Sequence, residues 1–278
     1  MSRIISFFNF STISLGRWVL ESIEYAFNIL GMTYLSLRAP IMDRAQGMRS
    51  IFSVVSAQIY FTGWQAFPLV SVLALASGCF VIIPSTTQLS FFGGSEMIGN
   101  LMIAIIVREL GPLFVAMIVT ARSGTAVASE LGNMKANREI EALAAVGISP
   151  LSYIVFPRII GGTISTLCLG FYFDIVALLG GFLATRLLHQ MPVSYYTESI
   201  SQALTAGDLM LLLLKNSFSG AIIFVISSYQ GLLVQRSPHE VPQVTTKAVL
   251  NSIIYVVAFN VIVSGFFYLN QLMQLGVI

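Results

Sequence analysis

The sequence predicts an all-α integral membrane protein, because of its composition and its long apolar stretches. Of its 278 residues, 56% are hydrophobic and 9% are charged, whereas soluble domains carry about 25% charged residues. With so few charges, the chain cannot cover a globular surface with solvated groups. It does contain several apolar stretches of about 20 residues, the length at which a helix crosses about 30 Å of hydrocarbon. The predicted fold is therefore a bundle of transmembrane helices.

Five apolar segments are dense enough to span a membrane. The stretch from Ile51 to Ser95 has no charged residue, and Pro84 lies inside the first predicted span. We treat residues 1–278 as a single domain, since no internal repeat or low-complexity tract stands out. The five predicted transmembrane helices cover residues 67–92, 97–121, 158–186, 209–234 and 248–272.

The basic residues of the short loops predict the orientation, because cytoplasmic loops of membrane proteins are enriched in Lys and Arg. Most Lys and Arg fall on one side of the predicted membrane, while the other side has Arg186 and Lys215 near a helix end. We therefore expect a bacterial inner-membrane protein with a cytoplasmic N-terminus and, after five spans, a periplasmic C-terminus. The basic residues on the expected cytoplasmic side are Arg3, Arg17, Arg38, Arg44, Arg49, Arg122, Lys135, Arg138, Arg158, Arg236 and Lys247.

The N-terminal segment, residues 12–37, predicts a helix with a narrow polar stripe. Arg17, Glu21, Glu24 and Asn28 follow one another at helical spacing, and apolar residues cover the rest of the surface. A helix lying in the membrane interface keeps such a stripe among the headgroups. The alternative is a sixth span with the stripe packed inward. The charges fall near the middle of the segment, where burial in lipid costs most, so the interfacial interpretation is favoured.

A long segment on the expected cytoplasmic side, residues 122–157, predicts a helical elbow. Glu139 and Glu141 occupy a first helical turn, where negative charge suits the helix dipole. Gly147 stands where that helix stops. One interpretation is a solvated loop helix, and the other is a docking surface for a cytoplasmic partner. The candidate docking residues are Glu130, Lys135, Arg138, Glu139, Glu141, Leu143 and Gly147.

Two adjacent charges, Arg108 and Glu109, lie halfway along the second predicted span. A charge at this depth costs about 2.5–3.5 kcal/mol, so partners or water must offset it. Neighbouring residues of a helix point in different directions, so the two cannot pair with each other. Pro112 has no N–H to give to the carbonyl of Arg108, which leaves a backbone acceptor at the same depth. These features predict a water-accessible cavity.

Lys215 and Asp174 are the other charges expected inside the membrane. Lys215 either extends its ammonium outward to the interface or pairs with Glu109 across helices. In the second case, Arg108 is left to contact an anionic phosphate, which its planar fork of donors suits. Asp174 has either a structural hydrogen bond or a role in transport. The candidate substrate cavity thus comprises Arg108, Glu109, Pro112, Asp174 and Lys215.

The block from Val107 to Arg158 carries a resemblance. It includes the runs Arg108-Glu109-Leu110-Gly111-Pro112, Ala121-Arg122-Ser123-Gly124 and Glu130-Leu131-Gly132. This block closely resembles the hallmark segment of MlaE/YrbE-type permeases, the membrane subunits of MCE-associated lipid ABC transporters. Within it, "EALAAVGISP" is similar to the signature by which ABC-importer permeases contact their ATPase. The resemblance covers nearly the whole chain, except that residues 235–244 replace the Gly-rich loop usual in the family.

The resemblance implies a homodimer that works with two copies of a cytoplasmic ABC ATPase and a periplasmic MCE-domain protein. Its expected substrate is phospholipid or a related lipid. The sequence has no G-x-x-x-x-G-K-[ST] phosphate loop. We therefore expect no enzymatic activity and no cofactor in this chain, with ATP and Mg²⁺ bound by the partner ATPase.

Composition also narrows the other partners and ligands. A net charge of +2 argues against nucleic acid. His189 and His239 lack other ligands at metal-binding spacing, so no metal site is expected. Cys79 and Cys168 fall in apolar stretches and are expected to be small buried thiols.

Two other classes of function remain open. One is a secondary transporter driven by an ion gradient, with Glu109 or Asp174 as proton carrier. The other is a membrane scaffold that transports nothing, which would have little reason to bury Arg108 and Glu109. Of the three classes of function, only the ABC permease predicts a stoichiometric ATPase partner.

Overall fold

The computed structural model of the chain describes residue 20 and residues 24–40, 48–92, 98–189, 192–235 and 237–274. Within these ranges the chain is almost wholly helical and has no strand. Five segments are long and apolar enough to cross a membrane, which confirms the predicted fold class. They are Ile51–Thr86, Ile98–Ala136, Leu151–Leu188, Ala206–Leu232 and Pro238–Met273.

The first span is built from two helices that meet at a joint. Helix α2 (Met48–Thr62) leads through a 3-10 turn, η1 (Trp64–Ala66), into α3 (Phe67–Phe92). Pro84 lies inside α3, as the sequence predicted. The apolar path across the membrane thus begins well before residue 67, where the sequence analysis placed it.

The second span is one continuous helical segment that changes its winding twice. It runs through α4 (Ile98–Met102), the π-helix η3 (Ile103–Leu110), α5 (Gly111–Val119), the π-helix η4 (Thr120–Gly124) and α6 (Thr125–Ala136). The helix continues past the predicted end of the span near Ala121, and its last part, α6, packs against α10 and α11. Segments of π-helix are rare and often occur at functional sites, and η3 holds Arg108 and Glu109.

The elbow after α6 has the helix and the stop that the sequence predicted. Arg138 adopts a left-handed backbone, φ 59°, at the turn between α6 and α7 (Glu139–Ala145). Gly147 ends α7 at φ 81°. The amides of Gly147 and Ile148 donate to the carbonyls of Ala144 and Leu143 at 3.1 and 3.0 Å. This is the Schellman arrangement, which favours glycine at its left-handed position.

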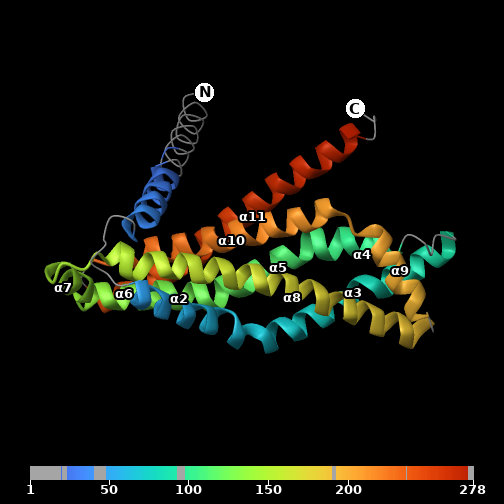
Figure 1. Ribbon diagram of the computed structural model, residues 1–278, viewed down its shortest axis with the longest axis horizontal. Coiled ribbons are helices and arrows are strands. Elements are labelled where there is room, and N and C mark those ends of the chain that lie inside the picture. The colour runs from blue at the N-terminus through green and yellow to red at the C-terminus, as the bar shows by residue number, and fades with distance from the viewer. Residues whose placement is uncertain are drawn as a thin grey trace, which may run out of the picture.

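The remaining helices form the centre and one wall of the bundle. The chain re-enters through the π-helix η5 (Leu151–Val155) and continues as α8 (Phe156–His189), α9 (Val193–Ala203), α10 (Ala206–Leu232), η6 (Pro238–Glu240) and α11 (Val241–Gln274). The amphipathic helix α9 was not predicted. Figure 1 shows α8 and α10 running through the middle of the molecule, while the end of α11 diverges from it.

Close contacts between helices depend on small residues. A Cβ added at Gly78 of α3 would lie 1.9 Å from the carbonyl oxygen of Ala177 of α8, so only glycine allows this approach. The expectation of two buried thiols is wrong for Cys168, which is exposed, while Cys79 is half-buried. Cys168 is apolar enough for a surface that faces lipid, and this is why hydrophobicity alone did not separate the two positions.

The described N-terminal helix runs over residues 24–40 and so includes residues 24–37 of the predicted 12–37 segment. Residues 12–19 and 21–23 lie outside the described residues. Figure 1 shows it leaving the bundle at the α6 end, across the direction of the long helices. Tyr25 of this helix contacts the bundle: its phenol oxygen accepts a 2.8 Å hydrogen bond from Gln230 Nε2 of α10. Burial raises the pKa of Tyr25, which keeps this phenol neutral.

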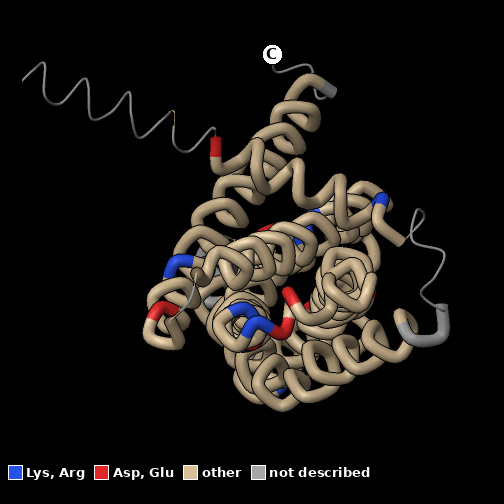
Figure 2. Tube along the Cα trace, turned by 90° about the vertical axis from the view of Figure 1, so that its left-hand side faces the viewer, with Lys and Arg blue, Asp and Glu red and all other residues tan. Residues whose placement is uncertain are grey.

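Charged residues are sparse on the wall of the bundle. Figure 2, seen from the α7 end, shows an outer surface made almost wholly of uncharged residues, with charges at the near end and in the interior. A lipid-facing wall requires this distribution, because a charge on it would be costly. The interior charges therefore need an explanation of their own.

Candidate functional site

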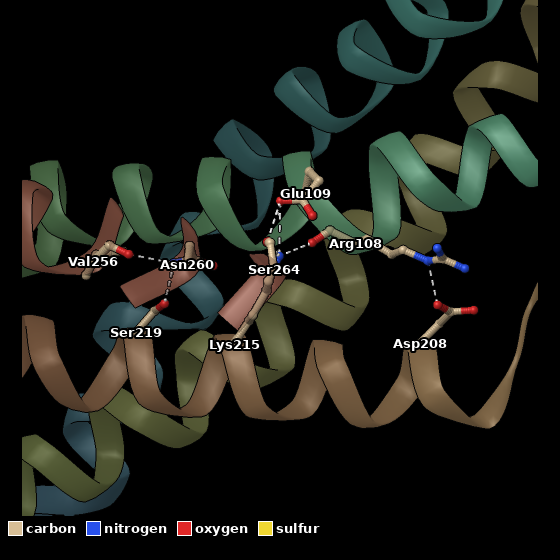
Figure 3. A network of polar contacts seen from close by, with 8 residues as sticks. All are labelled: Arg108, Glu109, Asp208, Lys215, Ser219, Val256, Asn260 and Ser264. Atoms are coloured by element: carbon tan, nitrogen blue, oxygen red, sulfur yellow. Dashed lines mark hydrogen bonds and ion pairs between the residues drawn. The ribbon is translucent and has the colours of Figure 1, made fainter. Parts of the chain in front are cut away.

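The centre of the bundle contains a cluster of charged and polar side chains from three parts of the chain (Figure 3). Arg108 and Glu109 come from η3, Lys215 from α10 and Ser264 from α11. We call these four residues the central cluster. It joins helices that are more than 40 residues apart in sequence.

Lys215 is the anchor of the central cluster, with no exposed surface. Its ammonium donates to Glu109 Oε2 at 3.1 Å, to Ser264 Oγ at 2.7 Å and to the carbonyl oxygen of Arg108. Ser264 Oγ in turn donates to Glu109 Oε2 at 2.9 Å. The three protons of the ammonium thus have three acceptors. The predicted Glu109–Lys215 pair is present, and the alternative in which Lys215 extends outward to the interface is wrong.

The backbone acceptor predicted at Pro112 has a partner. Proline removes the N–H that would bond the carbonyl of Arg108 in an α-helix. Lys215 Nζ donates to this carbonyl instead. A buried carbonyl without a partner would cost free energy, so Pro112 and Lys215 belong to the same arrangement even though they lie on different helices.

Arg108 has a protein partner that the sequence analysis did not name. Its Nε donates to Asp208 Oδ1 at 2.6 Å, and its guanidinium lies 5.3 Å from the ring centroid of Phe267. Asp208 is fully buried in the first turn of α10, where its other oxygen accepts from the backbone N–H and hydroxyl of Thr205. Sequence reasoning missed Asp208 because the predicted span began one residue later. The Thr205-x-x-Asp208 spacing, an acidic variant of the capping box, was the available signal.

Polar contacts continue along α10 beyond the central cluster. Asn260 of α11 donates to Ser219 Oγ at 3.1 Å and to the carbonyl of Val256 at 2.8 Å (Figure 3). Asp208, Lys215 and Ser219 lie along one helix, so α10 presents a buried polar stripe to its neighbours. In a membrane such a stripe faces the interior of the bundle or a wet cavity.

Asp174 does not join the central cluster. It is buried on α8 against α5, where a Cβ added at Gly111 would lie 2.1 Å from Asp174 Oδ1. Neither carboxyl oxygen has a hydrogen-bond partner among the described residues. The geometry thus places Asp174 beside the second span but apart from Lys215 and Glu109.

An apolar groove of about 630 Å³ lies near Arg108, because one of its lining residues, Phe267, contacts the Arg108 guanidinium. It lies between the first half of α10 and the second half of α11, the part that diverges in Figure 1. Met210 and Leu214 line one wall, and Val263 and Phe266 line the other. Phe267 also lines the groove and contacts the Arg108 guanidinium, so the groove has a cationic group at its edge.

The candidate docking residues of the elbow are mostly exposed. Lys135 Nζ lies 3.2 Å from Glu141 Oε1, and Glu141 is 59% exposed. Asn137 Nδ2 lies 3.4 Å from Glu139 Oε1. Leu143 packs partly against the core and connects α7 to the bundle.

Glu130 differs from the other predicted docking residues in its partner. Its Oε1 accepts a 2.7 Å hydrogen bond from Arg158 Nη2, which ties α6 to α8. Arg138 and Gly147 hold the two left-handed positions that bound α7. These two residues shape the elbow rather than offer side-chain contacts.

A bundle of five spanning helices with ion pairs at its centre defines a multi-pass membrane protein with a polar interior, a construction typical of transport proteins. The chain belongs to the MlaE permease family: the family model for Permease MlaE matches residues 55–266. This range contains all four residues of the central cluster, Asp208 and the elbow. It confirms the family resemblance found in the sequence.

Similar proteins occur in bacteria and in a plant. A "Probable ABC transporter permease protein" of Rickettsia bellii is 30% identical over 217 residues, 78% of this chain and 84% of that protein. A protein of the same description from Synechocystis is 24% identical over 263 residues, 95% of this chain and 94% of its own length. "Protein TRIGALACTOSYLDIACYLGLYCEROL 1, chloroplastic" of Arabidopsis thaliana is 25% identical over 211 residues, 76% of this chain and 60% of that protein. The chain is thus an ABC transporter permease by family.

Proposed function

We propose that this chain is the permease subunit of an ABC transporter that moves phospholipid or a related lipid across or out of a bacterial inner membrane. The observation that carries the proposal is the apolar groove between α10 and α11 with Arg108 at its edge, in a chain of the MlaE family. A lipid has the matching chemistry, an apolar chain joined to a polar headgroup.

The groove suits an acyl chain, because its walls are apolar and it lies within the spanning part of the bundle. The headgroup then contacts the guanidinium of Arg108. Asp208 is bound by the Nε atom of this guanidinium. The planar guanidinium binds phosphate well. The Arabidopsis relative is named for trigalactosyldiacylglycerol, which is a lipid, and this supports the substrate class.

The central cluster has a positioning role in this proposal. Lys215 connects η3, α10 and α11 at one point, and α11 is a wall of the groove. A shift of α11 relative to α10 would therefore disturb the Glu109–Lys215–Ser264 contacts and the groove together. Coupling of this kind, through an element with two arrangements, allows distant ATP hydrolysis to act on a substrate site.

A separate ATPase docks at the elbow in this proposal. Exposed Glu139 and Glu141 and the rigid frame of α7 offer a charged surface at the cytoplasmic end of the bundle. The ATPase binds ATP and Mg²⁺, so the chain itself is a transport subunit and not an enzyme. The N-terminal helix lies in the cytoplasmic interface, and the C-terminus is periplasmic.

The proposed assembly is a homodimer with a periplasmic MCE-domain protein. Helix α11 supports dimerisation: its most apolar stretch is only 17% buried, less than in the other four spans. A second copy of the chain would close the open side of the groove and shield it from the bilayer.

A second candidate function is transport driven by an ion gradient. The observation in its favour is Asp174, which is buried and has no hydrogen-bond partner among the described residues. An intramembrane carboxyl group of this kind is a typical proton carrier. Glu109 is the other candidate carrier, and it is paired with Lys215.

Purification of the tagged chain from its native membrane separates the two candidates. The ABC proposal predicts a stoichiometric ATPase in the purified material and ATP hydrolysis that depends on the permease. A chain that purifies without an ATPase, and moves substrate when only an ion gradient is applied, contradicts the proposal.

A further inference from the structure

A second polar site lies far from the central cluster, where α2, α6 and α8 meet. A groove of about 250 Å³ opens there, lined by apolar Val54 and Phe61 and by polar Gln58, Glu130 and Arg158. Arg158 is 7% exposed, and its Nη2 donates to Glu130 Oε1 at 2.7 Å. Its Nη1 is buried and has no hydrogen-bond partner among the described residues.

An unpaired guanidinium nitrogen favours the binding of a hydrogen-bond acceptor. Leaving a buried charged donor unsatisfied costs free energy comparable to the loss of a strong hydrogen bond. Within the described residues, Arg158 therefore has an unpaired donor, and its side chain lines the groove. The opposite wall holds Glu130, whose side chain is 61% exposed and whose Oε1 alone is engaged by Arg158. The groove thus presents one donor and one acceptor of opposite charge side by side.

The groove lies at the depth of lipid headgroups. Helix α10 has 27 residues, a length of about 40 Å, which matches a bilayer with its headgroup layers. Near the end of α10, a Cβ added at Gly231 would lie 2.7 Å from Leu131 Cβ on α6. Glu130 precedes Leu131, so it stands at the level where α10 leaves the hydrocarbon.

We propose that this groove binds the headgroup of a zwitterionic phospholipid with a primary amine, with its phosphate on Arg158 and its ammonium on Glu130. The two charges of the headgroup then lie against two protein charges of opposite sign, so the arrangement stays neutral. Gln58, whose Nε2 donates to Thr62 Oγ1 at 2.7 Å, lines the wall beside the phosphate position. The acyl chains remain outside, in the bilayer, because the groove has room for a headgroup only.

Charge makes the site selective. An anionic headgroup without an amine would bring its phosphate near the Glu130 carboxylate and has no ammonium to pair with it. Phosphatidylglycerol therefore binds more weakly than phosphatidylethanolamine. The site is separate from the groove beside Arg108, since it is formed by α2, α6 and α8 rather than by α10 and α11. It does not depend on which substrate the permease carries.

The test is a competition between two lipids for the purified full-length permease. The protein is reconstituted in nanodiscs of equal parts phosphatidylethanolamine and phosphatidylglycerol, and the lipids it retains in detergent are identified by native mass spectrometry. The wild-type chain retains phosphatidylethanolamine in preference to phosphatidylglycerol. Glu130→Gln lowers this preference by roughly tenfold or more, the loss of one charge-assisted hydrogen bond. Glu198→Gln, the matched control at an exposed carboxylate of α9, leaves it unchanged.

A second variant keeps the test decisive if loss of charge at Glu130 disturbs folding. Ala57→Phe fills the groove, of which Ala57 is an exposed lining residue, without changing any charge. It abolishes the preference for phosphatidylethanolamine, whereas Ala76→Phe, the same increase in bulk at an exposed position of α3, does not. Equal retention of the two lipids by the wild type would overturn the proposal. So would an unchanged preference in Ala57→Phe, or a Glu130→Gln protein that loses its ATPase but keeps its lipid preference.

Discussion

The central cluster and the elbow both carry ion pairs, but they differ in how much protein surrounds them. Lys215 is fully buried and has acceptors on Arg108, Glu109 and Ser264. At the elbow, Lys135 meets Glu141 only six positions along the chain, and Glu141 is 59% exposed. The same chemical pair is therefore a structural element in one region and a solvated surface contact in the other.

Burial decides what each pair contributes. Removing one partner of a buried ion pair strands the other in a medium of low dielectric, while an exposed pair is screened by water. Substitutions in the central cluster should therefore affect the stability of the permease itself. Substitutions at the elbow should leave the permease intact and affect only its partner.

The largest effect is expected for Glu109→Ala. This change leaves the buried ammonium of Lys215 without a counter-charge, a penalty of at most roughly 3–5 kcal/mol, because the Glu109 side chain is 39% exposed. We expect low abundance in the membrane and a lower thermal unfolding midpoint in detergent. The double variant Glu109→Ala/Lys215→Met should be less harmed than the sum of the single variants. Strict additivity in this cycle would show that the two residues do not stabilise each other.

A smaller effect is expected for Arg108→Ala. Asp208 loses its cationic partner but keeps its two hydrogen bonds to Thr205, which keep the expected loss below the roughly 3–5 kcal/mol of a stranded buried charge. The variant complex should assemble and hydrolyse ATP but move less lipid, since Arg108 stands at the edge of the groove. Lipid transport in proteoliposomes measures this, with Arg108→Lys as the control that keeps the charge but not the planar fork. Normal transport in Arg108→Ala would remove the residue from the substrate path.

At the elbow, Leu143→Pro should disrupt α7 without unfolding the permease. A proline inside a helix costs about 3 kcal/mol or more, but α7 is a single short helix at the end of the bundle, so the damage should stay local. We expect the ATPase to be lost on purification while the permease still inserts and keeps its unfolding midpoint. Leu143→Ala, which keeps the helix, should retain the ATPase. An intact complex with full ATPase activity in Leu143→Pro would end the assignment of α7 as a docking helix.

The smallest effect is expected for Glu141→Gln. The exposed pair with Lys135 contributes less than about 1 kcal/mol. The unfolding midpoint of the isolated permease should therefore stay within experimental error of the wild type, as measured by thermal unfolding. A marked fall in this midpoint would mean that the elbow is coupled to the bundle far more tightly than its exposure indicates.

The sequence predicted much of the fold because a membrane-spanning helix requires a long run of apolar residues. The length of the apolar stretches identified the five spans of the described residues. Gly147 predicted the end of α7, where the structure shows a left-handed backbone. The end of the second span could not be predicted, because α6 is held in a continuous helix by contacts with α10 and α11. The π-helical winding of η3 likewise leaves no clear signal in residue types.

The candidate site was predictable where a local rule applied. Pro112 predicted that the backbone carbonyl of Arg108 lacks its helical hydrogen bond. The high cost of a charge inside the membrane predicted a partner for Glu109. The choice of Asp208 as the partner of Arg108 depends on a contact between residues 100 positions apart, which no local pattern encodes. The lack of a hydrogen-bond partner for Asp174 within the described residues was also visible only in three dimensions.

ATP-driven lipid movement by the whole complex is the most direct measurement. The permease, its ATPase and its periplasmic partner are reconstituted in proteoliposomes with a labelled phospholipid, and movement of the label is followed with and without ATP. We predict movement that requires ATP and the ATPase, is unaffected by collapse of ion gradients, and falls in the Arg108→Ala complex. Movement that continues without ATP and stops when a proton gradient is collapsed would contradict the assignment of this chain as an ABC lipid permease.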